Sequence, residues 1–249
     1  DEEREVRKVL RRAEELLRRS LKKAEEVTRE TRKRIKELLD ELRKVLERAE
    51  RELRRIRREK ERGDEKKLAD ELEKVVREIV KRLEEILRKL LEVIRTNMRR
   101  NHEINRENLE IVREIVEELK RILEERGLPR EDLERLVRKL EDLLRRNEKK
   151  DKDINRRYKE LVDRLEELVK DITRRLRELL ERLKKRIDET GLDDRLIEEI
   201  KRILEEIIKL IADLARRVLK IDEESVKLDE DNLREVLKIL EDVVRDSER

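Results

Sequence analysis

Apolar side chains recur every three or four residues along almost the whole chain, which is the spacing of one face of an α-helix. The pattern breaks at three equally spaced glycines, Gly63, Gly127 and Gly191, and at the one proline, Pro129. The long segments between these breaks contain neither glycine nor proline. We therefore expect four long helices joined by short loops, at about residues 2–62, 65–126, 129–189 and 193–247.

The breaks carry the signals of helix ends. A glycine just past a helix end adopts the left-handed cap conformation without strain, and Asp64 and Asp193 are suited to cap the helices that follow. Loops this short make consecutive helices antiparallel neighbours. The apolar period is 3.6 residues, close to that of a straight helix, rather than the 3.5 of a supercoiled one. The expected fold is all-α: residues 1–249 form one single-chain antiparallel four-helix bundle of very long, nearly straight helices.

Charged residues make up 57% of the chain, a composition that could indicate disorder. The strict apolar period argues against disorder and is typical of long helices or coiled coils. The net charge is only +4, unlike that of a strongly basic nucleic-acid-binding protein. No apolar run is long enough for a membrane span or a signal peptide, and there is no cysteine. We therefore expect a soluble protein.

Polar residues replace aliphatic ones on the apolar stripe of the second helix, at Asn97, Asn101 and Asn108. Folding the chain back at its three loops brings the polar residues of all four stripes to similar levels. We expect buried hydrogen bonds among Ser20, Thr28, Thr31, Asn97, Asn101, Asn105, Asn108, Asn147, Asp151, Asn155, Tyr158, Ser225, Asp229 and Asn232.

Matching levels also predicts particular partners, to within about one residue. The expected pairs are Asn97 with Tyr158 and Thr31, Tyr158 with Ser225, Asn108 with Asn147 and Ser20, and Asp151 with Asn232. Buried polar groups that pair only in one arrangement penalise every other arrangement. Our hypothesis is that these side chains set the register and topology of otherwise similar helices.

Taken together, the chain resembles a computationally designed (de novo) helical bundle with buried hydrogen-bond networks. The resemblance covers the whole chain and rests on equal helices, similar loops, a core of Leu, Ile and Val, and matched polar positions. It implies a synthetic structural scaffold with no catalytic residue, cofactor or metal site. It also implies a protein with no natural location that is soluble in the cytoplasm of an expression host. It also implies a monomer that requires no partner and binds neither nucleic acid nor membrane. The alternative is an interaction module, a homo-oligomer or one half of a designed pair, whose helical hairpins pair with another copy or partner.

Other functions have weaker support in the sequence. His102 could form a metal site with Asp153, Asp229 and Asp231, but one histidine among carboxylates is a weak signal. Tyr158 could be a catalytic proton donor, although a core residue with a hydrogen-bonded hydroxyl is the simpler interpretation.

The basic stretches Arg54–Arg62 and Arg145–Lys159 contain interspersed acids and no aromatic stacking platform, so they are typical of a solvated face. A natural rod of the spectrin-like or BAR-like type would carry more aromatic residues than this chain does. An enzyme would be expected to leave a pocket signal, and continuous aliphatic packing leaves none.

Overall fold

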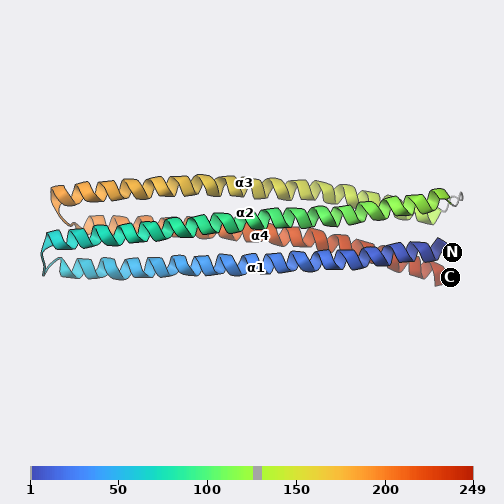
Figure 1. The fold of residues 1–249 in the computed structure, drawn as a ribbon, viewed down its shortest axis with the longest axis horizontal. Coiled ribbons are helices and arrows are strands. Elements are labelled where there is room, and N and C mark those ends of the chain that lie inside the picture. The colour runs from blue at the N-terminus through green and yellow to red at the C-terminus, as the bar shows by residue number, and fades with distance from the viewer. Residues whose placement is uncertain (1, 126–130, 249) are drawn as a thin grey trace. The chain divides into compact units, whose positions relative to one another are not determined.

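The computed structural model describes residues 2–125 and 131–248 and contains four α-helices that pack against one another (Figure 1). They are α1 (Glu2–Glu59), α2 (Glu65–Glu125), α3 (Glu131–Thr190) and α4 (Asp194–Glu248). No strand occurs in these two ranges. The predicted all-α four-helix bundle is confirmed, and most predicted helix ends lie within one or two residues of the observed ones.

The starts of α2 and α4 follow the predicted capping chemistry. The Asp64 carboxylate accepts a hydrogen bond from the backbone N–H of Lys66 at 3.2 Å, and that of Asp193 accepts one from Arg195 at 3.2 Å. Each bond satisfies a backbone donor that has no partner within its own helix. Both residues are therefore confirmed as N-caps.

The helix ends differ between the two described loops. Gly191 follows α3 with a φ of 72°, the left-handed conformation predicted for it, and its N–H donates to the Ile187 carbonyl at 3.1 Å. The prediction was wrong for Gly63, whose φ is not positive. There α1 ends earlier, at Glu59, and residues 60–62 form a separate turn before Gly63. Gly127 and Pro129 lie outside the described residues.

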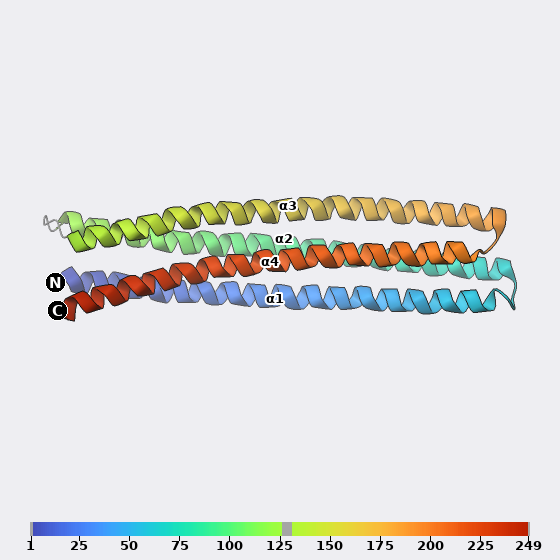
Figure 2. The same cartoon turned by 180° about the vertical axis from the view of Figure 1, so that it is seen from behind.

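The chain divides into two compact units, each built from parts of all four helices. The first unit comprises Asp1–Glu30, Thr96–Lys159 and Leu219–Arg249, and the second comprises Thr31–Arg95 and Glu160–Val218. In the first unit the start of α1 and the end of α4 lie side by side, as Figure 1 and the opposite view in Figure 2 both show.

The first unit has an aliphatic core near the chain ends, built on all four helices. Its buried members are Val6, Leu10, Ala13, Leu17, Ile111, Val112, Ile115, Val116, Leu119, Leu133, Leu136, Val137, Leu140, Leu143, Leu233, Val236 and Ile239. The second unit is filled by residues of the same kind, among them the fully buried Leu42, Leu83, Leu176 and Ile207. Removal of this apolar surface from water is the main force that holds each unit together.

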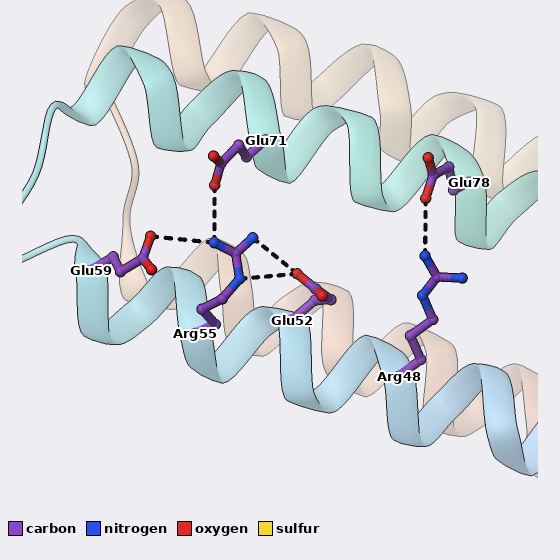
Figure 3. A network of polar contacts seen from close by, with 6 residues as sticks. All are labelled: Arg48, Glu52, Arg55, Glu59, Glu71 and Glu78. Carbon is purple, nitrogen blue, oxygen red and sulfur yellow. Dashed lines mark hydrogen bonds and ion pairs between the residues drawn. The ribbon is translucent and has the colours of Figure 1, made fainter.

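The surface of the second unit carries ion pairs between neighbouring helices. Arg55 of α1 lies between three carboxylates, Glu52 at 3.0 Å, Glu59 at 3.3 Å and Glu71 of α2 at 3.2 Å (Figure 3). The hydrogen bond that Arg55 donates to Glu52 raises the pKa of its guanidinium above the ordinary value, against the opposing effect of burial and with further contributions from the neighbouring carboxylates. Because all four side chains are at least one-third exposed, each pair stabilises the fold by only about 0–1 kcal/mol.

Candidate functional site

The predicted polar residues are buried as expected, and the structure gathers most of them in the first unit. Every one of the fourteen except Asn155 is buried, and Asn155 is half-buried. Thr31 is the exception in location, because it belongs to the second unit. Its predicted pairing with Asn97 of the first unit stays a prediction. Ten of the other buried residues form three clusters on helix faces that otherwise carry Leu, Ile and Val. Thr28 and Asp151 lie outside these clusters, and the prediction was wrong for Thr28, whose hydroxyl has no hydrogen-bond partner among the described residues.

The Asp222 cluster consists of Asn97, Asn101, Tyr158 and Asp222. One carboxylate oxygen of Asp222 accepts hydrogen bonds from the side-chain amides of Asn97 at 2.6 Å and Asn101 at 3.1 Å, and from the Tyr158 hydroxyl. Asn101 also donates to the Asn97 side-chain oxygen at 3.0 Å and approaches the Tyr158 hydroxyl at 3.2 Å. Three helices thus converge on a side chain that is fully buried.

The environment of Tyr158 keeps its hydroxyl neutral. Burial raises its pKa well above the ordinary value of a phenol, and the negative charge of Asp222 and the hydrogen bond to it raise it further. A phenol in this state donates a hydrogen bond and does not release its proton near neutral pH. The arrangement therefore positions Tyr158 as a fixed donor to Asp222.

The Asp229 cluster consists of Asn105, Ser225 and Asp229. One terminal atom of the Asn105 amide faces Asp229, 3.0 and 3.1 Å from its two carboxylate oxygens, and the other lies 2.9 Å from the Ser225 hydroxyl. When the nitrogen faces Asp229, Asn105 donates to the carboxylate and accepts from Ser225. When the oxygen faces Asp229, the nitrogen donates to Ser225 instead.

Two further carboxyl groups, those of Asp151 and Asp229, are buried in the first unit. Burial, followed by the charges of Asp151 and Glu230, raises the pKa of Asp229 to about 8. Burial also raises the pKa of Asp151, against the opposing influence of His102 and of hydrogen bonds from Asn105 and Asn155. At neutral pH the Asp229 group is therefore largely a neutral acid that can itself donate a hydrogen bond.

The third cluster, the asparagine relay, takes one residue from each helix. The amide of Asn147 on α3 donates to Asn232 on α4, and the amide of Asn232 donates to Asn108 on α2. Asn108 in turn donates to the Ser20 hydroxyl on α1 at 3.2 Å. All four side chains are at most 1% exposed, so no member has ready access to water as a substitute partner.

The observed partners agree only in part with those that level matching predicts. The pairs Asn108–Ser20 and Asn97–Tyr158 are confirmed. Asn108 and Asn147 do not bond to each other as predicted, because each of them bonds to Asn232. Tyr158 bonds to Asp222 rather than to Ser225, and Ser225 bonds to Asn105 instead. Asn232 bonds to Asn147, which lies one helical turn before the predicted Asp151. On α4 and α3, then, the hydrogen-bonding partners are displaced by about one turn from the predicted levels.

Asp222 is the member of the site that the sequence analysis missed. It begins the acidic run Asp222-Glu223-Glu224, which has the composition of a solvated face, and the apolar Ile221 beside it takes the expected stripe position. The spacing along the sequence could have identified Asp222 as a member. The intervals between Val218, Asp222, Ser225 and Asp229 are four, three and four residues, as on one face of a helix. Those intervals place Asp222 on the same face as two predicted members.

The candidate metal ligands are not brought together. Within residues 2–125 and 131–248 no group of three or more His, Cys, Asp or Glu side chains is placed to hold a metal ion. Asp153 forms ion pairs with Arg156 at 2.6 Å and Arg157 at 3.2 Å. The carboxyl group of Asp229 faces the side-chain amide of Asn105. His102 opposes the rise that burial causes in the pKa of Asp151.

The second unit has a groove of about 620 Å³ between α1 and α2. Val45, Val75 and Ile79 line it together with charged residues, and an ion pair at 3.5 Å, Arg48 with Glu78, lies in its wall (Figure 3). The lining holds neither a histidine nor a hydroxyl group. It therefore does not form a catalytic constellation of a nucleophile and a base.

The fold and the site define an all-α four-helix bundle with hydrogen-bonded polar side chains in its interior. None of the described helices combines the length and apolarity needed to cross a membrane. Comparison with protein-family models, with curated proteins and with solved structures gave no match to this chain.

Proposed function

We propose that the chain is a designed structural scaffold without enzymatic activity or required partner, whose buried polar side chains set the register and topology of its helices. The support comes from the contrast between plain aliphatic packing and the few polar positions within it. Uniform apolar faces fit one another in several registers, so they provide stability without a unique arrangement. Expression as a soluble protein in a host cytoplasm belongs to the same proposal.

The asparagine relay is the observation that carries this proposal. It touches each of the four helices once, and each Asn is bonded to a residue on another helix. A slip of one helix by a single turn would separate its member from the others and leave buried donors or acceptors without partners. Each such orphaned group costs about 1–3 kcal/mol.

A role in register predicts a specific response to removal of the whole relay. The variant is Ser20→Ala, Asn108→Leu, Asn147→Leu and Asn232→Leu together. Replacing all partners of a buried hydrogen-bond cluster with apolar groups is often neutral or stabilising. We expect the melting temperature, followed by circular dichroism, to stay the same or rise. Size-exclusion chromatography with light scattering should then show several assembly states.

The control exchanges aliphatic residues inside the second unit, with Leu176→Ile and Ile207→Leu. This pair keeps the total core volume and leaves the relay intact, so one assembly state should remain. A sharp fall in the melting temperature of the relay variant, with one unchanged assembly state, would assign the relay to stability and overturn the proposal.

The unmodified chain also distinguishes the scaffold from the interaction module. A scaffold without a partner should elute as a 30.7 kDa monomer at all concentrations tested. A discrete dimer in the same measurement would favour an assembly module whose hairpins pair with a second copy.

A further inference from the structure

Asp151 of α3 and Asp229 of α4 are two carboxyl groups buried in the first unit, 7% and 1% exposed. In the part of the chain that the structure describes, neither forms an ion pair with a lysine or arginine. One oxygen of Asp151 has no hydrogen-bond partner there. Burial of two acids without a cation is costly unless at least one of them holds a proton.

The groups that face this pair come from every neighbouring helix. From α2, Asn105 lies against Asp229 and also hydrogen-bonds Asp151. The charges of His102 and Arg106, on the same helix, act on Asp151 as well. The half-buried Asn155 of α3 donates to Asp151, and Glu230 adds a negative charge from α4.

On α1, no side chain that is buried in the described part of the first unit carries a charge. The charged Lys23 of α1 is exposed and pairs with Glu107 of α2 at 3.5 Å. No helix therefore supplies a buried cation that would compensate an ionised Asp229.

The amide of Asn105 fits Asp229 in both protonation states. A protonated Asp229 is a donor, so it pairs with the Asn105 oxygen, and the Asn105 nitrogen then donates to Ser225 at 2.9 Å. An ionised Asp229 accepts only, so it needs the nitrogen, at 3.0 and 3.1 Å from its two oxygens. The exchange requires only rotation of one side-chain amide by half a turn.

We propose that Asp229 and Asn105 form a pH-sensitive latch that acts on the first unit alone. Below the transition, Asp229 donates its proton to the Asn105 oxygen and the first unit is closed. As the pH rises from about 4 to about 8, opening of the first unit increasingly lets Asp229 release its proton to a base in the solvent, and this favours the open form. Above about pH 8, Asp229 ionises in the closed form as well, and the Asn105 amide then turns over. Among the described residues of the second unit no Asp or Glu is buried, so that unit has no such switch.

The direction of the pH effect follows from the raised pKa of Asp229, about 8 in the folded protein against about 3.9 for an unfolded aspartate. The protonated folded form contributes its full stability below pH 4 and loses it as the pH rises to about 8. Across this window the equilibrium constant for opening increases about tenfold per pH unit, and above pH 8 it levels off. This inference does not depend on the chain being a scaffold.

Hydrogen exchange measured by mass spectrometry tests the latch, with rates corrected for the intrinsic effect of pH. Between pH 6 and pH 8 we expect protection of first-unit peptides, such as 100–118 and 225–240, to fall about 100-fold. Second-unit peptides such as 70–90 should keep their protection over the same range. An equal loss in both units would overturn the proposal.

The variant Asp229→Asn should abolish the pH dependence, because its amide can donate to Asn105 in the same way as the protonated acid but does not titrate. The matched control Asp153→Asn removes a half-exposed acid from the same unit. This variant should retain the pH dependence of protection. If the protection of first-unit peptides still falls with rising pH in Asp229→Asn, the proposal is overturned.

A direct titration of the unmodified protein keeps the test independent of how any variant folds. Carbon-detected NMR of the Asp229 carboxyl group should show a transition near pH 8, together with a change in the Asn105 side-chain amide signals. A carboxyl that titrates below pH 6, or an amide that does not respond, would overturn the proposal.

Discussion

The two units are built from parts of the same four helices but fill their interiors differently. In the second unit the buried side chains are aliphatic, with Thr31 the one polar residue among those described. In the first unit an aliphatic core near the chain ends gives way to the Asp222 cluster, the Asp229 cluster and the asparagine relay. The exposed faces of both units carry the same mixture of Glu, Lys and Arg.

The two kinds of interior are expected to respond differently when one helix slips against its neighbours. Aliphatic packing depends on area and volume, and a one-turn slip can restore most of both. Hydrogen bonds between buried side chains depend on particular partners, and a slip restores none of them. We infer that the second unit mainly contributes stability, while the first unit contributes the choice of arrangement.

The largest expected effect comes from placing a first-unit residue in the second unit. Leu176→Asn would remove a fully buried aliphatic side chain and leave an amide without a partner in an aliphatic interior. The two losses together should reduce the free energy of unfolding, measured in urea, by about 3–5 kcal/mol. Leu176→Met is the control and should cost less than about 1.5 kcal/mol. A tolerated asparagine would mean that the interior of the second unit is accessible to water.

A smaller loss is expected when the acceptor of the Asp222 cluster is removed. Asp222→Ala leaves the donors of Asn97, Asn101 and Tyr158 without their shared oxygen, which should cost about 3 kcal/mol of unfolding free energy. Asp222→Asn retains an acceptor oxygen in nearly the same volume and should cost about 1 kcal/mol. Equal losses in the two variants would show that the donors find other partners and that the contrast between the units is overstated.

The smallest effect belongs to the exposed ion pairs of the second unit. Arg55→Met removes contacts with Glu52, Glu59 and Glu71 but retains an apolar stem, so the unfolding free energy should fall by less than about 1 kcal/mol. The difference from the unmodified protein should shrink further in 1 M salt, where charges are screened beyond about 3 Å. A loss above 2 kcal/mol that persists in salt would place stability in the surface charges and not in the interior.

The sequence predicted the helices well because their signals are local. The apolar period and the capping residues Asp64 and Asp193 act within a few residues of their own position. Burial of Asn97 and Asn108 was also predictable, because an asparagine on an otherwise aliphatic stripe has a restricted set of explanations. The early end of α1 was not, since residues 60–62 carry no breaker and their turn is a property of the loop.

Partners across helices were harder to predict than positions along them. Level matching assumes that each loop reverses the chain symmetrically, and a loop can instead displace the next helix along its axis. A displacement of about one turn preserves the helical face but changes the partner, so Tyr158 hydrogen-bonds to Asp222, and Ser225 is bonded to Asn105 instead. Asp222 was missed for the same reason, and because its acidic neighbours have the composition of a solvated surface.

The burial of Tyr158 has a spectroscopic consequence. The chain contains one tyrosine and neither tryptophan nor phenylalanine, so its near-ultraviolet absorption and its intrinsic emission arise from a single phenol in the first unit. Far-ultraviolet dichroism, by contrast, averages over the backbone of all four helices. Recording both signals through one denaturation curve compares the unit around Tyr158 with the whole molecule. Coincident curves would describe one cooperative transition, and separated curves would describe two.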